Sequence, residues 1–163
     1  MYKRQENCEA DRLLGVSLTG QWDCGAVHNE DILKELKAEA VRTNKKYAKR
    51  FGINPSTSVT CVKPSGNVSQ LVDASSGMHP RHAQYYIRRV RISATDPLFH
   101  MVRDQKFPYK PEVGQPADTA YTYVLEFPVK SPANSLMKND LSALKQLEHW
   151  KMVKESYTEH NPV

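Results

Sequence analysis

Apolar residues recur at near-helical spacing in two long segments of this chain. The first begins near the capping candidates Asn29 or Asp31, and Gly52 stands where such a helix ends. Its apolar positions are Ile32, Leu36, Ala40, Tyr47 and Phe51. The same spacing returns from about Asp140, at Leu141, Leu144, Leu147, Trp150, Val153 and Tyr157. Both segments are predicted to be helices.

Four shorter segments have the pattern of strands. Residues 12–20 form an apolar run that ends at Gly20, and residues 57–62 are rich in β-branched side chains. Residues 85–93 are predicted to form a third strand, and residues 121–129 alternate as a strand with one buried face does. Strands that alternate with helices predict an α/β fold built from crossover units.

Turns, short helices and a loop are predicted to connect these elements. A turn at residues 63–67 leads into a brief helix that ends near Leu71. Asp96 and Pro97 have the residue types favoured at the cap and first position of a further helix. Residues 108–119 contain Pro108, Pro111, Gly114 and Pro116, and they are expected to form an exposed loop.

Length and composition indicate one ordinary globular domain. The chain has 163 residues, a formal net charge of +5 and a mean hydropathy of −0.64. No window approaches the roughly 20 apolar residues that span a bilayer, and the first residues lack the apolar core of a signal peptide. We therefore expect no membrane association, and the cytoplasm is the default location.

The cysteines and histidines do not predict a metal site. Cys8, Cys24 and Cys61 are odd in number and form no CxxC pair, so neither a disulfide framework nor a four-cysteine zinc site is expected. His79 and His82 are three residues apart without a nearby cysteine or carboxylate, which is a weak metal signal. A hydrogen-bonded surface loop is the alternative for these histidines.

The stretch CVKPSGNVSQL, residues 61–71, is the first candidate for ligand chemistry. Its turn lies between a predicted strand and a predicted helix, where backbone amides are free to face an anion. Gly66 permits close approach, and Ser65, Asn67, Ser69 and Lys63 carry donors or charge. Neither GxxxxGK[ST] nor GxGxxG is present, so on spacing alone the stretch is either a phosphate site or simply a turn.

A second candidate is the basic strand YYIRRVR. Aromatic residues interleaved with arginines are typical of nucleic-acid binders, and they also occur in strands with one polar face. A non-enzymatic nucleotide- or nucleic-acid-binding module is therefore one functional alternative for the chain.

Four stretches, in this order, resemble one enzyme family. They are DRLLGVSLTGQWD, CVKPSGNVSQLVDASSGMHPRHAQYYIRRVRISATDPL, LEFPVK and LEHWKMVKESYTEHNP. Together they are similar to the C-terminal part of the catalytic barrel of adenosylcobalamin-dependent ribonucleotide reductases, particularly the ribonucleoside-triphosphate reductases. The resemblance covers nearly the whole chain from about Gln5 onward.

This resemblance implies a fold and a chemistry. The fold is a ten-stranded α/β barrel, of which residues 1–163 are expected to be a single partial domain. The reaction converts ribonucleoside triphosphates to 2′-deoxyribonucleotides for DNA synthesis through a cysteine thiyl radical that adenosylcobalamin generates. Thioredoxin or a similar dithiol is the implied reductant, and nucleic acid is not an expected partner.

The resemblance also assigns site residues. The family's PSGT turn, which cradles the substrate phosphates, corresponds to Pro64, Ser65, Gly66 and Asn67, with asparagine in place of threonine; Val68 and Ser69 continue this site. The asparagine replaces a hydroxyl by an amide and is expected to retune the contact. The implied cobalamin-side residues are Gly77, Met78 and His79.

The radical chemistry itself is not expected within these residues. The family's finger loop with its radical cysteine, its redox cysteine pair and its effector-binding part have no counterpart here, and none of the three cysteines matches those positions. No catalytic residue is therefore assigned, and the chain alone is expected to be an inactive piece of a longer enzyme. Residues 1–4 match no family pattern and are interpreted as foreign to it.

Overall fold

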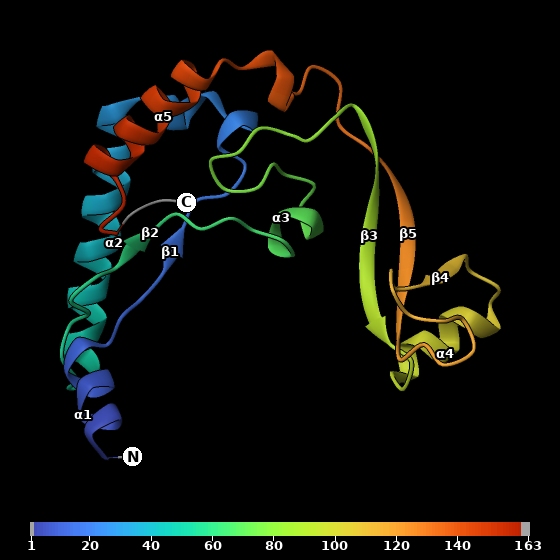
Figure 1. Cartoon of the computed structure of the whole chain (residues 1–163). Helices are drawn as coiled ribbons and strands as arrows, with labels where there is room; N and C mark the ends of the chain where they lie inside the picture. Colours follow the sequence, from blue (N-terminus) through green and yellow to red (C-terminus); the bar gives the residue numbers. More distant parts are fainter. Residues whose placement is uncertain (1, 161–163) are drawn as a thin grey trace. The chain divides into compact units, whose positions relative to one another are not determined.

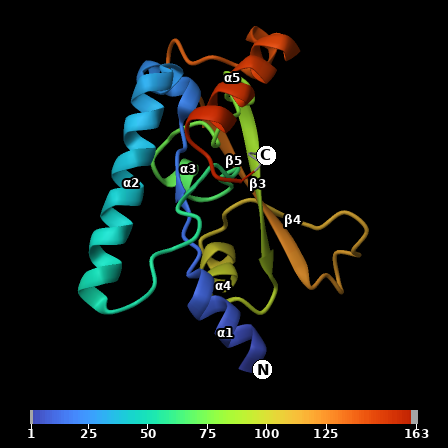
Figure 2. The same cartoon turned by 90° about the vertical axis from the view of Figure 1, so that its left-hand side faces the viewer.

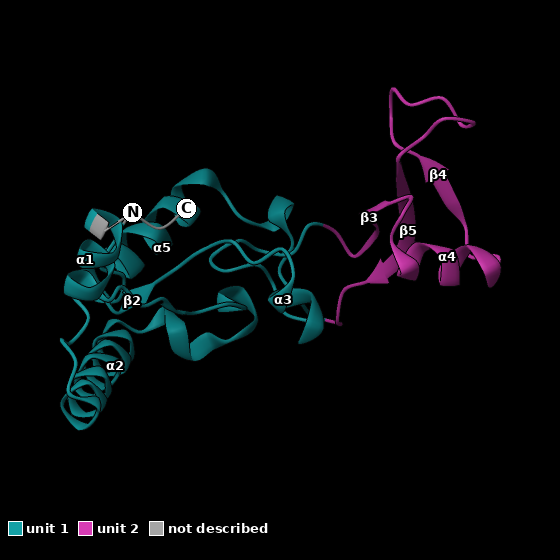
Figure 3. Ribbon diagram, turned by 90° about the horizontal axis from the view of Figure 1, so that it is seen from below, with its two compact units in different colours: residues 1–82, 134–163 teal, residues 83–133 magenta. Residues whose placement is uncertain are grey.

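A computed structural model describes residues 2–160, which divide into two compact units (Figure 3). Unit 1 contains the chain up to His82 and from Asn134 onward, and unit 2 contains Ala83–Ala133. Each unit has its own sheet and is considered by itself below. None of the helices in this described part is both long and apolar enough to cross a membrane.

Unit 1 is organised around a β-α-β crossover (Figure 1, Figure 2). Strand β1 (Val16–Ser17) pairs in parallel with β2 (Thr60–Cys61), and the long helix α2 (Glu30–Phe51) lies between them in the chain. Parallel strands require such a crossover connection. The predicted α/β class is confirmed.

Both strands of unit 1 are much shorter than predicted. Only two residues of each predicted segment form ladder pairs. The first segment is also not buried, because Leu13, Leu14 and Val16 have exposed fractions of 67%, 50% and 44%. The prediction of a buried strand over residues 12–20 is therefore wrong for this chain.

Helix α2 begins and ends where its capping residues predict. The Asn29 side chain accepts hydrogen bonds from the amides of Asp31 and Ile32, and Gly52 adopts a left-handed conformation with φ of 66°. The buried positions are Leu33 and Ala48, whereas three of the predicted apolar positions, Leu36, Tyr47 and Phe51, are exposed. The predicted apolar stripe is therefore only partly a core face.

Helix α5 (Ala143–Ser156) packs against α2 (Figure 1). It begins later than predicted, because the Ser142 hydroxyl accepts the amide of Lys145 and caps the helix there. Its apolar residues divide into two groups: Leu144 and Leu147 are exposed, and Val153 contributes to the core of unit 1. That core consists of Val27, Leu33, Val62, Met78, Val153 and Tyr157.

Short elements complete unit 1. They are α1 (Tyr2–Asp11), η1 (Gln21–Asp23), η2 (Gly25–His28), α3 (Val68–Leu71) and η3 (Lys138–Asp140). Met1 lies outside the described residues, and the structure places residues 2–4 in α1. That residues 1–4 are foreign, and that the whole chain is one partial domain, stay predictions.

Unit 2 is an antiparallel three-stranded sheet in the order β3-β5-β4. Strands β3 (Tyr85–Ser93) and β5 (Thr122–Lys130) pair along their whole length, and β4 (Tyr109–Pro111) pairs with β5. The predicted strand over 85–93 is confirmed. The expected loop at residues 108–119 was partly wrong, since it contains β4, which places Pro111 at a strand end where a missing amide is tolerated.

Helix α4 (Pro97–Asp104) packs aromatic residues against the sheet of unit 2. Asp96 caps the helix by accepting the amide of Leu98 at 2.8 Å, as predicted. Phe99 is buried and stacks on Tyr123 with ring centroids 4.5 Å apart, and Tyr109 meets both rings edge-on. The buried apolar residues of unit 2 are Phe99 and Leu125, whereas Tyr109 is 40% exposed at the edge of this aromatic group.

Candidate functional site

The predicted phosphate turn lies between β2 and α3 in unit 1. Pro64, Gly66, Asn67 and Val68 are exposed, and Ser65 is half-buried beneath them. Ser69, the last residue of the predicted site, is fully buried at the start of α3. The structure therefore brings the six predicted residues together as one turn with an exposed outer side and a buried base.

Ser65 is the most constrained residue of this turn. Its amide donates to the Ser76 hydroxyl at 2.8 Å, and the same hydroxyl donates to the Ser65 carbonyl at 3.0 Å. The Ser69 amide donates to the Ser65 hydroxyl at 2.8 Å, and the Ser69 hydroxyl donates to the Ser65 carbonyl at 2.6 Å. The Ser69 hydroxyl hydrogen is therefore already used inside the turn, so Ser69 supports the turn from below.

The outer side of the turn has unused donors. No hydrogen bond among the described residues uses the backbone amide of Asn67 or of Val68. The Asn67 side chain makes no capping hydrogen bond. Exposed amides at the entry to a helical turn favour an anion, although α3 is only one turn long and its dipole contribution is correspondingly small.

Gly66 leaves open space above these amides. A Cβ built on Gly66 meets no heavy atom within 4 Å, and the residue does not have a positive φ. Neither backbone conformation nor internal packing therefore requires glycine at this position. A ligand that approaches the backbone closely is one physical reason for glycine here.

The charge near the turn is positive. Lys63 is exposed, and its amide donates to the Ser17 hydroxyl at 3.3 Å. Burial, together with the positive charges of Lys63 and Lys154, lowers the pKa of His160. Lys63 thus supplies local positive potential, and this potential favours an anion over a cation at the turn.

The predicted cobalamin-side residues differ in how exposed they are. A Cβ on Gly77 would lie 2.8 Å from the Lys63 carbonyl oxygen, so Gly77 serves close backbone packing. Met78 is buried in the core, and its carbonyl accepts hydrogen bonds from Trp22 and Gln146. Only His79 is exposed, and its Nδ1 lies 3.3 Å from the Ser76 carbonyl. Of the three residues only His79 therefore presents its side chain to the outside, and their contact with cobalamin stays a prediction.

Arg81 is a structural residue in the same loop. Its guanidinium is 7% exposed and pairs with Asp23 at 3.2 Å and with Asp73 at 2.9 Å. Burial disfavours the charged form, but the hydrogen bonds to Asp73 and Asp23 outweigh burial and raise the pKa of Arg81. The loop is therefore rich in hydrogen bonds, as predicted, but at Gly77, Met78 and Arg81 it is buried.

Metal-ligating and thiol groups are dispersed. Among the described residues no three histidine, cysteine or carboxylate side chains gather as metal ligands, and His79 and His82 are both exposed. The thiols are free and range from exposed to half-buried; they are those of Cys8, Cys24 and Cys61.

The sequence analysis missed a cluster of two histidines and a tryptophan, in which Trp22 and His149 are buried and His28 is exposed. The rings of Trp22, His28 and His149 meet pairwise with centroids 4.6–4.8 Å apart. His149 Nε2 contacts Gln21 Oε1 at 2.7 Å, and its buried Nδ1 has no partner among the described residues. Burial, and secondarily the charge of His28, lowers the pKa of His149 to about 4. No periodicity signalled this cluster, because its members are far apart in sequence.

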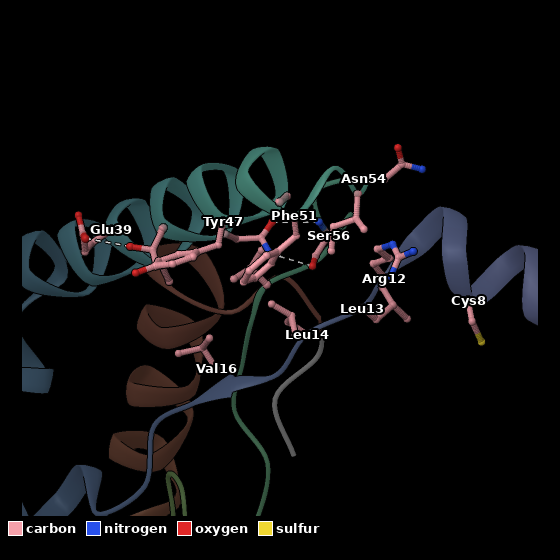
Figure 4. Close-up of a pocket in the computed structure, with 16 residues that line it drawn as sticks. Cys8, Arg12, Leu13, Leu14, Val16, Glu39, Tyr47, Phe51, Asn54 and Ser56 are labelled. Carbon is pink, nitrogen blue, oxygen red and sulfur yellow. Dashed lines mark hydrogen bonds between the residues drawn. The ribbon is translucent and has the colours of Figure 1, made fainter.

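An apolar cavity of about 690 Å³ lies between the segment Cys8–Val16 and helix α2 (Figure 4). Tyr47 and Phe51 of α2 lie opposite Leu14 and Val16 across it. Two of its polar residues satisfy each other, since Asn44 Nδ2 donates to the Ser56 hydroxyl and Asn44 Oδ1 accepts the Ser56 amide, whereas the buried Nε of Arg12 has no hydrogen-bond partner among the described residues. The cavity therefore has volume without converging reactive groups.

The basic strand is largely neutralised by carboxylates. In unit 2, Arg89 pairs with Glu126 at 3.0 Å, Arg91 pairs with Glu112, and Lys110 also contacts Glu126 at 3.1 Å. These arginines sit on an antiparallel sheet beside acidic neighbours. Arg89 and Arg91 therefore each have a carboxylate partner, which reduces the positive potential that a polynucleotide would meet on this strand.

Comparisons with known proteins point to one family. No family model matches the chain. Adenosylcobalamin-dependent ribonucleoside-triphosphate reductases are 35% identical over 78% of this chain in Lactobacillus gasseri and 34% identical over 69% of it in Lactobacillus acidophilus. The relative from Lactobacillus helveticus is 37% identical over 63% of the chain. These matches cover only 13–17% of the length of the relatives.

A solved structure has a similar fold. The crystal structure of a B12-dependent, class II ribonucleotide reductase matches 98% of this chain with a TM-score of 0.71 and 23% sequence identity. The match covers 26% of that protein. The arrangement of helices and strands described above is therefore the arrangement of one part of that larger fold.

Proposed function

This chain is homologous to a segment of the adenosylcobalamin-dependent ribonucleoside-triphosphate reductases, and on that premise we propose that it works as part of such an enzyme. The reaction would reduce ribonucleoside triphosphates to 2′-deoxyribonucleotides by thiyl-radical chemistry. The segment's own role is to hold the substrate phosphates at the turn Pro64–Ser69.

The observation that carries this proposal is the exposed side of the turn. Asn67 and Val68 are exposed and their amides have no described acceptor, while Ser65 is held by four hydrogen bonds. Backbone amides held in place before a ligand arrives bind phosphate oxygens without first having to be ordered. The exposed Asn67 side chain adds an amide donor where the family has a hydroxyl.

The chemistry at the ribose belongs to groups outside this segment. Adenosylcobalamin, when bound to the whole enzyme, supplies the radical. Within this chain, His79 is the exposed candidate for a contact on the cofactor side, and Gly77 and Met78 act by shaping the backbone next to it. No step of the reaction is assigned to a side chain of this segment.

Partners and location follow from the same proposal. Thioredoxin or a similar dithiol would reduce the whole enzyme, and no cysteine of this chain is assigned to that exchange. The proposed location is the cytoplasm, where ribonucleotides and reduced dithiols are available. Nucleic acid is not a proposed partner, since the basic strand is paired with Glu112 and Glu126.

Replacement of Gly66 by valine in the reductase that carries this segment tests the phosphate role. Open space at Gly66 lets the variant fold, but the added side chain covers the outer amides. We expect the KM for ribonucleoside triphosphate to rise about tenfold or more while the unfolding midpoint stays within a few degrees, since tenfold corresponds to about 1.4 kcal/mol. An unchanged KM would make the turn purely structural.

A further inference from the structure

The phosphate turn rests on a second loop, residues 73–82, whose role no sequence pattern indicated. The contact between them is concentrated at one side chain, because the Ser76 hydroxyl binds both backbone polar groups of Ser65. A serine hydroxyl has one donor and two acceptor positions, so a single side chain can make this pair of bonds. The orientation of Ser65 therefore depends directly on where Ser76 is held.

Ser76 is held by its neighbours on both sides. The Ser75 carbonyl accepts from the Gly20 amide at 2.8 Å and from the Thr19 hydroxyl at 3.0 Å. The Gly77 amide donates to the Thr19 hydroxyl at 3.0 Å, and its carbonyl accepts the Gln21 amide at 3.2 Å. Four hydrogen bonds thus fix the backbone on either side of Ser76 to residues 19–21.

Ion pairs of the buried Arg81 side chain anchor the same segment. The Asp23 carboxylate accepts the Ser75 amide at 2.6 Å and also binds Arg81. Arg81 in turn binds Asp73, so the two ends of the loop converge on one guanidinium. A charged group buried in this way is expensive to leave unpaired, which makes the arrangement of the loop specific.

A close backbone contact at Gly77 also fixes the position of this loop. Gly77 has a φ of 56°, and a Cβ there would lie 2.8 Å from the Lys63 carbonyl oxygen. The loop backbone therefore runs directly against the residues that lead into the phosphate turn. Contact at Lys63 and at Ser65 leaves the turn little freedom to move inward.

We propose that Ser76 is the positioning residue of the phosphate turn and that Arg81, through Asp23, keeps Ser76 in place. This inference rests on the proposed phosphate-binding function. Ser76 does not touch the ligand; it fixes Ser65 so that the following amides face outward before a phosphate arrives. Without Ser76 the turn would become ordered only when phosphate binds. The free-energy cost of that ordering would lower the phosphate affinity.

The experiment compares Ser76→Ala and Ser76→Thr with the unchanged 163-residue chain. Inorganic triphosphate is the probe, its Kd is measured by calorimetry, and exchange of the Ser65 amide hydrogen is followed by NMR. Because two hydrogen bonds are lost, we expect Ser76→Ala to weaken triphosphate binding about five- to thirtyfold and to speed Ser65 amide exchange at least tenfold. Ser76→Thr keeps the hydroxyl and is expected to restore both quantities.

Ser131→Ala is the matched control. Ser131 is buried, whereas Ser76 is half-buried, and the Ser131 hydroxyl donates to the Ala83 carbonyl at 2.8 Å within unit 2. We expect a comparable loss of stability without a loss of triphosphate affinity. If Ser76→Ala does not fold, Ser76→Cys replaces it, because a thiol keeps the size and weakens both bonds.

The two measurements separate this inference from the function on which it rests. Triphosphate affinity and Ser65 exchange that are both unchanged in Ser76→Ala would overturn the positioning role. If the unchanged chain does not bind triphosphate, the proposed function fails, and Ser65 exchange still decides whether Ser76 orders the turn. Equal affinity losses in Ser76→Ala and Ser131→Ala would reduce Ser76 to a general stabilising residue and overturn the proposal.

Discussion

The hydroxyl of Ser76 binds the amide and the carbonyl of Ser65 at 2.8 and 3.0 Å, although the two residues are eleven positions apart. This pair joins the turn after β2 to a loop that Arg81 and Asp23 hold in place. The turn is therefore braced on its inner side and open on its outer side. Such an arrangement fits a backbone site for an anion better than an ordinary surface turn.

Substitution by alanine is predicted to destabilise unit 1 at Gly77 but to leave its stability nearly unchanged at Gly66. Gly77→Ala places a Cβ 2.8 Å from a backbone oxygen at a φ of 56°, and we expect a loss of about 2 to 4 kcal/mol of unfolding free energy. Gly66→Ala meets nothing within 4 Å and is expected to change stability by less than about 1 kcal/mol. Urea unfolding of both variants measures the difference. A large loss in Gly66→Ala would mean that this glycine is structural.

Acidification is predicted to destabilise unit 1 through His149. Its pKa is lowered to about 4 in the folded chain from 6.5, so between these values the unfolded chain binds a proton that the folded chain does not. Above about pH 6.5 His149 is neutral in both states and does not reduce the stability of the fold. As the pH falls toward 4, proton binding by His149 in the unfolded chain increasingly favours unfolding. Over that range we expect a loss of roughly 2 to 3 kcal/mol, measured by urea unfolding at several pH values.

The variant His149→Gln identifies the source of this pH dependence. Glutamine does not titrate, and its side-chain amide can still donate to Gln21 Oε1, which His149 Nε2 contacts at 2.7 Å. We expect the variant to flatten the stability profile between pH 6.5 and 4. A profile as steep as that of the unchanged chain would assign the effect to other groups.

Glu159 is predicted to stabilise β2 from outside the sheet. Its carboxylate accepts the amides of Val59 and Thr60 at 2.6 and 2.9 Å. Desolvation raises the pKa of Glu159, but these backbone hydrogen bonds outweigh it, so the pKa is lowered and the contribution fades only as the pH falls below 4.5. Glu159→Gln weakens the acceptor, and a loss of about 1 kcal/mol at pH 7 is expected in urea unfolding. Equal stability of the two proteins at pH 7 would contradict this role.

The nucleic-acid alternative makes a distinct prediction. Because Glu112 and Glu126 pair with Arg91 and Arg89, the chain is expected to bind single-stranded DNA weakly. The double variant Glu112→Gln and Glu126→Gln frees both arginines and should strengthen binding at low salt by roughly tenfold or more, with a steeper salt dependence. Fluorescence anisotropy measures both effects. Tight, salt-dependent binding by the unchanged chain would favour the alternative.

The isolated chain is predicted not to reduce ribonucleotides. None of its cysteines matches the family's radical position, and two of them, Cys8 and Cys24, are exposed. The assay supplies adenosylcobalamin, a dithiol and a ribonucleoside triphosphate and measures deoxyribonucleotide formation. Product above the level without protein would show that the segment contains its own radical chemistry.

Local signals in the sequence predicted the helices and the long strand well. Asn29 and Gly52 mark the ends of α2, Asp96 marks the start of α4, and the run from Tyr85 produces β3 over its full predicted range. Each of these signals acts within a few residues, through capping bonds or side-chain shape. The turn at residues 63–67 was predicted from similarly local signals, whereas its phosphate-binding role came from the family resemblance and stays a proposal.

Features that depend on distant residues were not predictable in this way. The segment 12–20 looks like a buried strand, but only Val16 and Ser17 pair with β2, and its leucines are exposed. The brace at Ser76 depends on Asp23 and Thr19, which are more than fifty positions away. Periodicity contains no information about such pairings, so neither the brace nor the His149 cluster could be derived from it.

A titration of the isotopically labelled chain with a ribonucleoside triphosphate, followed by NMR, tests the phosphate site most directly. We predict that the amide signals of residues 66–68 shift first and furthest, and that Gly66→Val removes these shifts while other signals stay in place. Shifts confined to β3, or no shifts at millimolar triphosphate, would contradict phosphate binding at this turn.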